Sequence, residues 1–417
     1  MLDNVSALES ALKTLEQAAV LSKIDPNVLT MLREPQREYI TTFPIYLDDG
    51  TVQFFKGFRV QHNHALGPTG GGTRFHPEET YEDVKALALW MSIKNALNGI
   101  PAGGGKGGVI CDPKLLSRRE KERVCRGYIR AIAPMIGSGV DFPGADVGTN
   151  AEMMSWMLDE WEQMQGLRHE PAAISGKVIA LGGSEGRPQA TGLGVCLAVR
   201  EACKVLGINI KGAKFAIQGF GKVGSWAARL LQNEGAKLIA VSDYLGGIYQ
   251  PNGIDAFELT SFAHNQGSII GYPHAQQLAT SEEVLFIDCD ILVPAAVQST
   301  ITADNCDRIS ARLISEGANG PITPKAEEEL LNKGVFIIPD ILANGGGTCI
   351  AHLEKVQGLY DDYWSEDKIV RRYEKMFVEK FKQVYETSNQ EGLTMRMAAW
   401  VIALRTLEEG IKARGWV

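Results

Sequence analysis

Residues 213–231, AKFAIQGFGKVGSWAARLL, place three glycines between an apolar strand pattern and an amphipathic helical pattern. A G-x-G-x-x-G run in that position allows a tight turn and lets a pyrophosphate approach the N–H groups at the N-terminus of the helix. Asp243 follows the first of these glycines by 24 residues, at the end of the next strand pattern, where a carboxylate would accept hydrogen bonds from an adenosine ribose. A glycine-rich loop beside an unrelated surface aspartate is the alternative interpretation. The predicted dinucleotide-binding residues are Gly219, Gly221, Lys222, Val223, Gly224 and Asp243.

The same carboxylate bears on which dinucleotide binds. A negative charge at Asp243 repels the 2′-phosphate of NADP, and the next residues, YLGG at 244–247, offer no arginine or lysine to neutralise that phosphate. The sequence therefore predicts NAD as the cofactor, with NADP as the alternative.

Strand and helix patterns alternate through this part of the chain, which is typical of a mostly parallel, doubly wound α/β sheet. An earlier segment, 43–63, reads as a hairpin with its turn at Asp48-Asp49-Gly50, followed by helical patterns at 80–98 and 117–136. Long amphipathic helices follow Asn344. The five strands predicted for the doubly wound sheet are 213–218, 237–243, 286–296, 312–318 and 334–339.

A chain of 417 residues is too long for one core, so we expect a two-domain α/β protein. Residues 1–180 are predicted to form a substrate-binding and oligomerisation domain with a mixed sheet. Residues 181–343 are predicted to form a Rossmann domain, and the helices of 344–417 to pack back on the first domain and the cleft.

Charge and cysteine usage narrow the functional class. A net charge of −8 argues against nucleic acid or an anionic membrane as partner. Seven scattered cysteines without a C-x-x-C pair indicate reduced thiols in a cytoplasmic protein. His62 and His64 could ligate a metal, but no third ligand lies nearby, so a half-exposed strand edge is the better interpretation and we predict no metal.

Two glycine-rich stretches flank the predicted helix at 80–98: ALGPTGGGTRF at 65–75 and AGGGKGGV at 102–109, both interpreted as loops. Lys94 falls on or beside the buried face of that helix, where a charge is costly unless it meets an anion. Lys106 lies in the second stretch, where the missing side chains leave room for a ligand. Snorkelling of Lys94 to solvent and a solvated loop lysine are the alternatives. If both lysines converge on one small anion, each lowers the pKa of the other.

Several longer stretches resemble consecutive signatures of the glutamate dehydrogenase family, which includes leucine, phenylalanine and valine dehydrogenases. They include WMSIKNALNGIPAGGGKGGV, DFPGADVGTNAEM, LGGSEGRPQATGLGV, EGANGPITP and PDILANGGG, in order between residues 40 and 360. The resemblance implies reversible oxidative deamination of an L-amino acid to a 2-oxo acid and ammonia. It also implies a homo-oligomer, usually a hexamer.

The resemblance carries roles to individual positions. Lys94 matches the lysine that holds the substrate α-carboxylate, and Lys106 the catalytic lysine that polarises the 2-oxo group. Asp146 matches the general acid and base, although an aspartate before a helix is more often a cap or turn residue. Thr191 and Asn319 match residues near the nicotinamide, and Asn344 one that lines the cleft between the domains.

Three positions depart from the glutamate-specific pattern. Gly70, Ala351 and Met91 stand where that branch has a lysine, a serine and a polar residue around the substrate's side-chain carboxylate. Burying a carboxylate without a cation costs on the order of several kcal/mol. We therefore expect a substrate other than glutamate, with an apolar or aromatic side chain. The alternatives are a glutamate dehydrogenase with a rearranged pocket, its charge supplied by Arg74, His76 or His352, and a non-catalytic regulatory subunit of a mixed oligomer.

Overall fold

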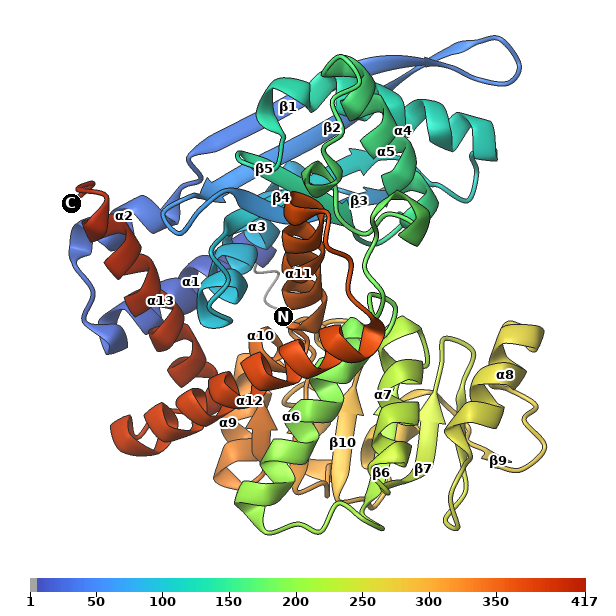
Figure 1. The fold of residues 1–417 in the computed structure, drawn as a ribbon. Helices are drawn as coiled ribbons and strands as arrows, with labels where there is room; N and C mark the ends of the chain where they lie inside the picture. Colours follow the sequence, from blue (N-terminus) through green and yellow to red (C-terminus); the bar gives the residue numbers. More distant parts are fainter. Residues whose placement is uncertain (1–5) are drawn as a thin grey trace. The chain divides into compact units, whose positions relative to one another are not determined.

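The computed structural model describes residues 6–417, which divide into two compact units (Figure 1). Unit 1 comprises the chain up to Arg187 together with Thr348–Arg372 and Met397–Val417. Unit 2 comprises Pro188–Gly347 and Tyr373–Arg396. We expected the helices of 344–417 to form one block with the first domain, whereas here residues 373–396 group with unit 2.

The sheet of unit 1 is mixed, as predicted, with the strand order β1-β2-β4-β3-β5. β1 pairs antiparallel with β2, β2 pairs antiparallel with β4, and β3 runs parallel to both β4 and β5. The predicted hairpin is confirmed, because β1 and β2 are joined by a turn in which Gly50 has a φ of 82°. The strands are β1 (Arg37–Tyr46), β2 (Val52–Asn63), β3 (Thr69–His76), β4 (Gly103–Ile110) and β5 (Asp141–Ala145).

Helices cover both faces of this sheet, and polar caps set where they begin. Thr80 caps one helix by accepting a hydrogen bond from Asp83 N, and Ser117 starts another with a capping box. α3 packs on one face against Phe58 and Val60 of β2, while α4 and α5 pack on the other. The helices of unit 1 are α1 (Ala7–Ser22), α2 (Pro26–Arg33), α3 (Tyr81–Leu97), α4 (Arg118–Ile132), α5 (Ala151–Met164), most of α11 (Gly346–Tyr360) and most of α13 (Met395–Ala413).

The two glycine-rich stretches form adjacent parallel strands, β3 and β4, so our interpretation of both as loops was wrong. Their glycines are needed because other groups occupy the space of the missing side chains. A Cβ at Gly104 would lie 2.3 Å from Ala88 O of α3. A Cβ at Gly107 would lie 2.4 Å from the Tyr128 hydroxyl and 3.1 Å from Arg59, which forms a fully buried ion pair with Asp141. Tertiary packing therefore overrides the poor strand propensity of glycine.

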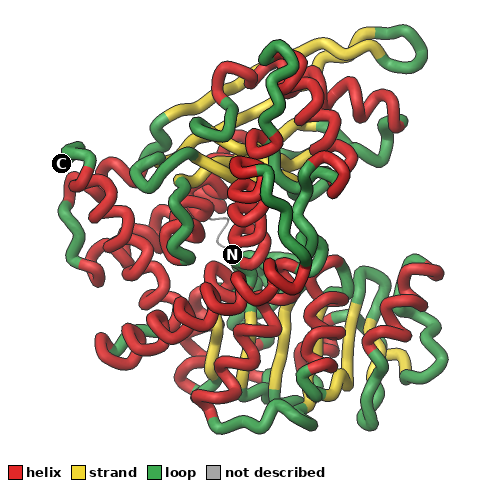
Figure 2. Tube along the Cα trace, in the orientation of Figure 1, coloured by secondary structure: helices red, strands yellow, loops and turns green. Residues whose placement is uncertain are grey.

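Unit 2 holds a seven-stranded sheet in the order β12-β11-β10-β6-β7-β8-β9. Figure 2 shows strands of this sheet in yellow beside red helices. The first five strands in that order are parallel, and β8 and β9 continue antiparallel at one edge. The predicted Rossmann sheet is confirmed, and its strand order reverses beside β6, which is therefore the switch point. The strands are β6 (Lys214–Gln218), β7 (Lys237–Ser242), β8 (Gly247–Tyr249), β9 (Gln276–Gln277), β10 (Ile291–Pro294), β11 (Leu313–Ser315) and β12 (Phe336–Ile338).

The helices of unit 2 alternate with these strands, and one returns from later in the chain. α12 joins this unit from Tyr373 onward, where Tyr373 and Phe377 are fully buried. The predicted strand at 286–296 is shorter than expected, because only Ile291–Pro294 form β10 and a 3₁₀ turn ends at Phe286. The helices are α6 (Ala190–Leu206), α7 (Lys222–Asn233), α8 (Ala256–Gln266), α9 (Pro324–Asn332), α10 (Asp340–Ala343) and α12 (Glu366–Glu391).

Two further expectations concern the histidine and cysteine side chains. His62 is buried rather than half-exposed, because β2 is an inner strand, and its ring contacts Ser92 Oγ and Leu32 O. All seven cysteines are free and buried. None of the helices within residues 6–417 has both the length and the apolar character needed to cross a membrane.

Candidate active site

The chemical half of the site is a buried lysine and an aspartate that meet in unit 1. Lys106 extends from β4 and is 4% exposed, and its Nζ donates to Asp146 Oδ2. Asp146 follows β5 in a turn closed by Thr149, whose hydroxyl accepts from Asp146 N at 2.8 Å. Asn150 caps α5, so the Asp146 carboxylate is left to face Lys106. The structure thus brings together the two residues that the sequence predicted to be catalytic.

Arg74 completes this cluster and was not predicted in that role. Its Nε donates to Asp146 Oδ1 at 3.1 Å, and Val147 N donates to the same oxygen at 2.7 Å. The sequence signal for this role of Arg74 was a basic residue at the end of a glycine-rich strand, two positions before His76. We did not predict the role because we expected a loop at this stretch.

The pKa values of Asp146 and Lys106 are both lowered, but by different physical causes. Burial alone would raise the pKa of Asp146, but the charges of Lys106 and Arg74 lower it below the ordinary aspartate range, so the carboxylate is ionised. Burial lowers the pKa of Lys106, against the attraction of Asp146. An ionised base therefore lies beside an ammonium that releases its proton more readily than a solvated lysine.

Gly72 makes room for the Asp146 carboxylate. A Cβ at this position would lie 2.4 Å from Asp146 Oδ2 and 2.7 Å from Asp146 Cβ. Real Cβ atoms essentially never approach another atom this closely, so any larger residue would displace the carboxylate. The central glycines of GPTGGGTRF are thus part of the site's geometry.

Lys94 and Met91 lie near each other on α3, as their spacing predicted. Both are partly buried. A Cβ at Gly71 of β3 would lie 3.3 Å from Met91 Cγ, so the methionine covers this strand directly. Of the two predicted substrate-binding residues of α3, Met91 therefore packs against the glycine-rich strand.

The position expected to select the substrate side chain is filled by a ring. A Cβ at Gly70 would lie 2.2 Å from Phe142 Cζ, so no larger residue fits there unless Phe142 moves. Lys355 of α11 places its Nζ 4.3 Å from the centroid of the same ring. Ala351, one turn earlier on α11, is 9% exposed. Lys355 was missed by sequence reasoning.

The cofactor half lies in unit 2, at the turn from β6 to α7. Gly219 has a φ of 94°, and a Cβ at Gly224 would lie 1.9 Å from Gly219 O, so both positions require glycine. A Cβ at Gly221 would meet no atom within 4 Å, and no side chain caps the helix that begins at Lys222, with Val223 next to it. Open space in front of uncapped N–H groups fits the pyrophosphate of a dinucleotide.

Asp243 lies at the end of β7, where the ribose-binding carboxylate was predicted. Oδ1 accepts from Leu245 N at 2.8 Å and Gly246 N at 3.3 Å, and Oδ2 accepts from Ser268 Oγ at 2.6 Å and Ile269 N at 2.9 Å. These donors occupy the usual acceptor positions of a carboxylate. A ribose hydroxyl would have to replace one of them, Ser268 Oγ being the most readily rotated. The ribose role of Asp243 stays a prediction.

Three further predicted residues lie in unit 2. Thr191 is in the first turn of α6 and is partly exposed. Asn344 Nδ2 donates to Asn319 Oδ1 at 2.9 Å and to Ala318 O at 3.2 Å, so the structure joins two of the predicted positions.

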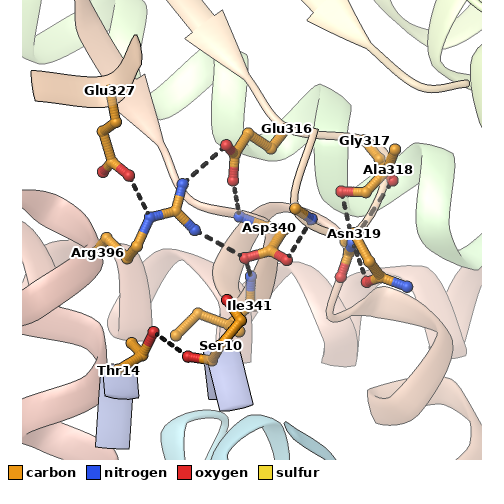
Figure 3. A network of polar contacts seen from close by, with 12 residues as sticks. Ser10, Thr14, Glu316, Gly317, Ala318, Asn319, Glu327, Asp340, Ile341 and Arg396 are labelled. Carbon is orange, nitrogen blue, oxygen red and sulfur yellow. Dashed lines mark hydrogen bonds and ion pairs between the residues drawn. The ribbon is translucent and has the colours of Figure 1, made fainter. Parts of the chain in front are cut away.

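The loop that carries Asn319 is held by an arginine that the sequence did not reveal. Arg396 binds Glu316 and Glu327 at 2.7 Å and Asp340 at 3.1 Å (Figure 3). Asp340 Oδ2 in turn accepts from Gly320 N at 3.0 Å. Burial raises the pKa of Glu316 to about 8, although Arg396 opposes this.

Comparisons with known proteins agree with this geometry. Residues 35–163 match the model of the Glu/Leu/Phe/Val dehydrogenase dimerisation domain, and residues 182–415 that of the glutamate/leucine/phenylalanine/valine dehydrogenases. The cryptic catabolic NAD-specific glutamate dehydrogenase of Bacillus subtilis is 40% identical over 418 residues, covering 100% of this chain and 97% of the relative.

Solved structures of glutamate dehydrogenases are also similar to this chain. Glutamate dehydrogenase from Peptoniphilus asaccharolyticus superposes with a TM-score of 0.89 at 37% identity, covering 99% of this chain and 100% of that one. The hetero-hexameric glutamate dehydrogenase from Thermus thermophilus, in its leucine-bound form, has a TM-score of 0.94 at 35% identity, covering 100% and 98%. From its sequence, its fold and the Lys106–Asp146 pair, the chain belongs to the glutamate/leucine/phenylalanine/valine dehydrogenase family, and it is an amino acid dehydrogenase.

Proposed function

We propose that this chain catalyses the reversible, NAD-dependent oxidative deamination of an L-amino acid to a 2-oxo acid and ammonia. The observation that carries the proposal is the buried contact between Lys106 and the ionised Asp146. NAD is supported by the carboxylate at Asp243, by the open space at Gly221 and by the NAD-specific relative.

In this reaction the residues of unit 1 bind the substrate and move its protons. Lys94 would pair with the α-carboxylate. Asp146 is ionised and can take a proton from the substrate ammonium, and after water adds it can return a proton to the departing ammonia. Lys106 can hydrogen-bond the oxygen that becomes the 2-oxo group, and its lowered pKa makes it a better proton donor. The bound nicotinamide supplies the acceptor for the hydride from the α-carbon.

Two classes of substrate side chain each have an observation in their favour. An apolar or aromatic side chain is favoured by Gly70, Met91 and Ala351, which offer no polar group at positions that bind a carboxylate in the resemblance. An acidic side chain is favoured by the relatives, which are glutamate dehydrogenases, and by the buried amine of Lys355.

Assembly belongs to the same proposal. The first matched domain is described as a dimerisation domain, and the relative from Thermus thermophilus is a hetero-hexamer. We propose that this chain also forms a hexamer, and light scattering of the purified protein would measure its mass. A cytoplasmic location stays a prediction from the cysteine pattern.

The direct test is a substrate panel. Purified protein is mixed with NAD or NADP and each of the twenty L-amino acids, and the absorbance of the reduced cofactor is followed. We expect turnover with NAD and at least one amino acid. No turnover with any of them, together with thermal stabilisation by an amino acid, would instead indicate a regulatory binding subunit and would overturn the proposal.

The role of Lys106 is tested by Lys106→Ala. This change should abolish turnover while NAD binding, measured by titration, is retained, because the cofactor residues lie in unit 2. Lys85→Ala is the matched control, since Lys85 is also a largely buried lysine of unit 1 but pairs with Glu34 and Glu38. Retained turnover in Lys106→Ala would refute the assigned role.

A further inference from the structure

A buried amine lies at the place where the sequence lacks a cation. Gly70 has no side chain, and the ring of Phe142 fills the adjoining space, with Cζ 2.2 Å from the Cβ position of residue 70. The same ring also contacts Lys355, whose Nζ lies 4.3 Å from the ring centroid. Position 70 and the Lys355 amine are therefore neighbours across a single aromatic ring.

The helix that carries Lys355 is held rigidly in unit 1. Glu354, its neighbour in sequence, is fully buried and accepts from Gly176 N at 2.9 Å and from Lys177 Nζ at 2.8 Å. Gln357 donates to Ser184 Oγ at 3.1 Å. These contacts fix the rotation of α11 about its axis. The fold therefore determines the face of the helix on which Lys355 lies.

The helical period connects Lys355 to a position already assigned to the substrate. Ala351 and Lys355 are four residues apart, so they lie on the same face of α11. Side chains on a helix extend toward its N-terminus, which directs the lysine toward Ala351. The small side chain of Ala351 leaves room for the amine where the family resemblance has a polar residue.

Lys355 contacts the Phe142 ring but has no ionic partner among the described residues. It is 7% exposed, and within residues 6–417 no carboxylate or carbonyl accepts a hydrogen bond from its Nζ. Burial lowers its pKa to about 8, against the attraction of Asp141, which is itself paired with Arg59. The amine still carries its proton at neutral pH, and a buried cation without a partner is stabilised by an incoming anion.

The other cations that the sequence offered cannot serve this purpose. Arg74 is paired with Asp146. Burial, together with the charge of the nearby Lys355, lowers the pKa of His352 to about 4, so this imidazole is neutral at physiological pH. His76 Nδ1 accepts from Glu78 N at 3.2 Å, which engages that ring locally.

We propose that Lys355 binds the distal carboxylate of an acidic L-amino acid, so that the cation absent at position 70 is supplied from α11. This assignment rests on the proposed function and selects the acidic class of substrate over the apolar one. The amine contacts the face of the Phe142 ring, and the missing side chain at Gly70 leaves space for this ring.

The test compares two substrates that differ in one group. L-Glutamate and L-norvaline have the same carbon chain, but only glutamate carries the distal carboxylate. Lys355→Met keeps the length of the side chain and removes its charge. We expect the KM for glutamate to rise about 10- to 100-fold, the range for a hydrogen bond to a charged group, with a smaller change in kcat. Activity with norvaline should be unchanged or higher, and Lys355→Arg should recover part of the glutamate affinity.

Lys368→Met is the matched control, because Lys368 also lies over an aromatic ring in unit 1, at 4.7 Å from the centroid of Trp364. The Lys368→Met change should leave the KM and kcat for both substrates unchanged. A Lys355→Met enzyme with an unchanged KM for glutamate, or an equal loss with norvaline, would overturn the assignment while leaving the proposed dehydrogenase intact. If no amino acid is turned over, the proposed function fails. The assignment of Lys355 is then supported if glutamate raises the melting temperature of the wild type but not of Lys355→Met, and overturned otherwise.

Discussion

Replacing Gly72 with alanine tests whether the Asp146 carboxylate must sit where the structure has it. The added methyl would lie 2.4 Å from Asp146 Oδ2, whereas ordinary contact begins near 3.4 Å. The carboxylate must therefore retreat by about 1 Å from the oxygen position that accepts from Lys106. A misplacement of this size costs on the order of 100-fold in rate, or about 2.7 kcal/mol of activation free energy.

The assay is steady-state turnover with NAD and the best substrate of the panel. We expect kcat of Gly72→Ala to fall by about two orders of magnitude. The pH profile supplies a second readout. Lys106 and Arg74 hold the pKa of Asp146 below its ordinary range, so weakening the Lys106 contact raises that pKa. The ionised carboxylate is then lost at higher pH, and the acidic limb of the profile moves upward.

Gly139→Ala is the control for this change. A Cβ at Gly139 meets no atom within 4 Å, and its backbone does not adopt the left-handed conformation. Its kcat, melting temperature and pH profile should match those of the wild type. A Gly72→Ala enzyme that folds and turns over within threefold of the wild type would refute the assigned position of Asp146.

Three further changes have expected outcomes. Gly221→Ala should weaken NAD binding at least tenfold, as measured by titration, without lowering the melting temperature, because the methyl would enter only the open space of the turn; unchanged affinity would place the pyrophosphate elsewhere. Glu354→Ala should lower the free energy of unfolding by about 3–5 kcal/mol in chemical denaturation, since Lys177 is left buried and unpaired; a loss below about 1 kcal/mol would contradict this. The KM for glutamate should rise with pH above about 8, as Lys355 loses the proton that attracts the carboxylate, and Lys355→Met should lack this rise.

Much of the fold follows from local pattern. The strand-turn-helix at the G-x-G-x-x-G stretch and strands at all five predicted positions are confirmed, as is the helix predicted from residue 80, because each depends on residues close together in sequence. The glycine-rich strands were mispredicted since their glycines make room for α3, Tyr128 and a buried ion pair, all of which come from other segments.

The candidate site likewise contains residues that local sequence patterns predict and residues that they do not. Lys106 and Asp146 were predicted from motifs, whereas Arg396 joins three carboxylates from three separate segments, and no local pattern signals such a network. Lys355 is different, because its spacing of one helical turn from Ala351 was visible in the sequence. The family resemblance names Ala351 and assigns no role to the position one turn later.

The interleaving of the two units has a consequence for how the chain is made. The ribosome completes the sheet of unit 1 first, but α11 and α13 of that unit emerge only after the whole of residues 188–347. Unit 2 begins later yet has all its segments once residue 396 has been synthesised, and unit 1 has all of its segments only at residue 417. The half that carries Lys106 and Asp146 is therefore the last to be finished, and Lys355 joins it only near the end of synthesis. A nascent chain stalled before residue 348 would have both glycine-rich strands and the catalytic pair, but it would lack the helix that we propose selects the substrate.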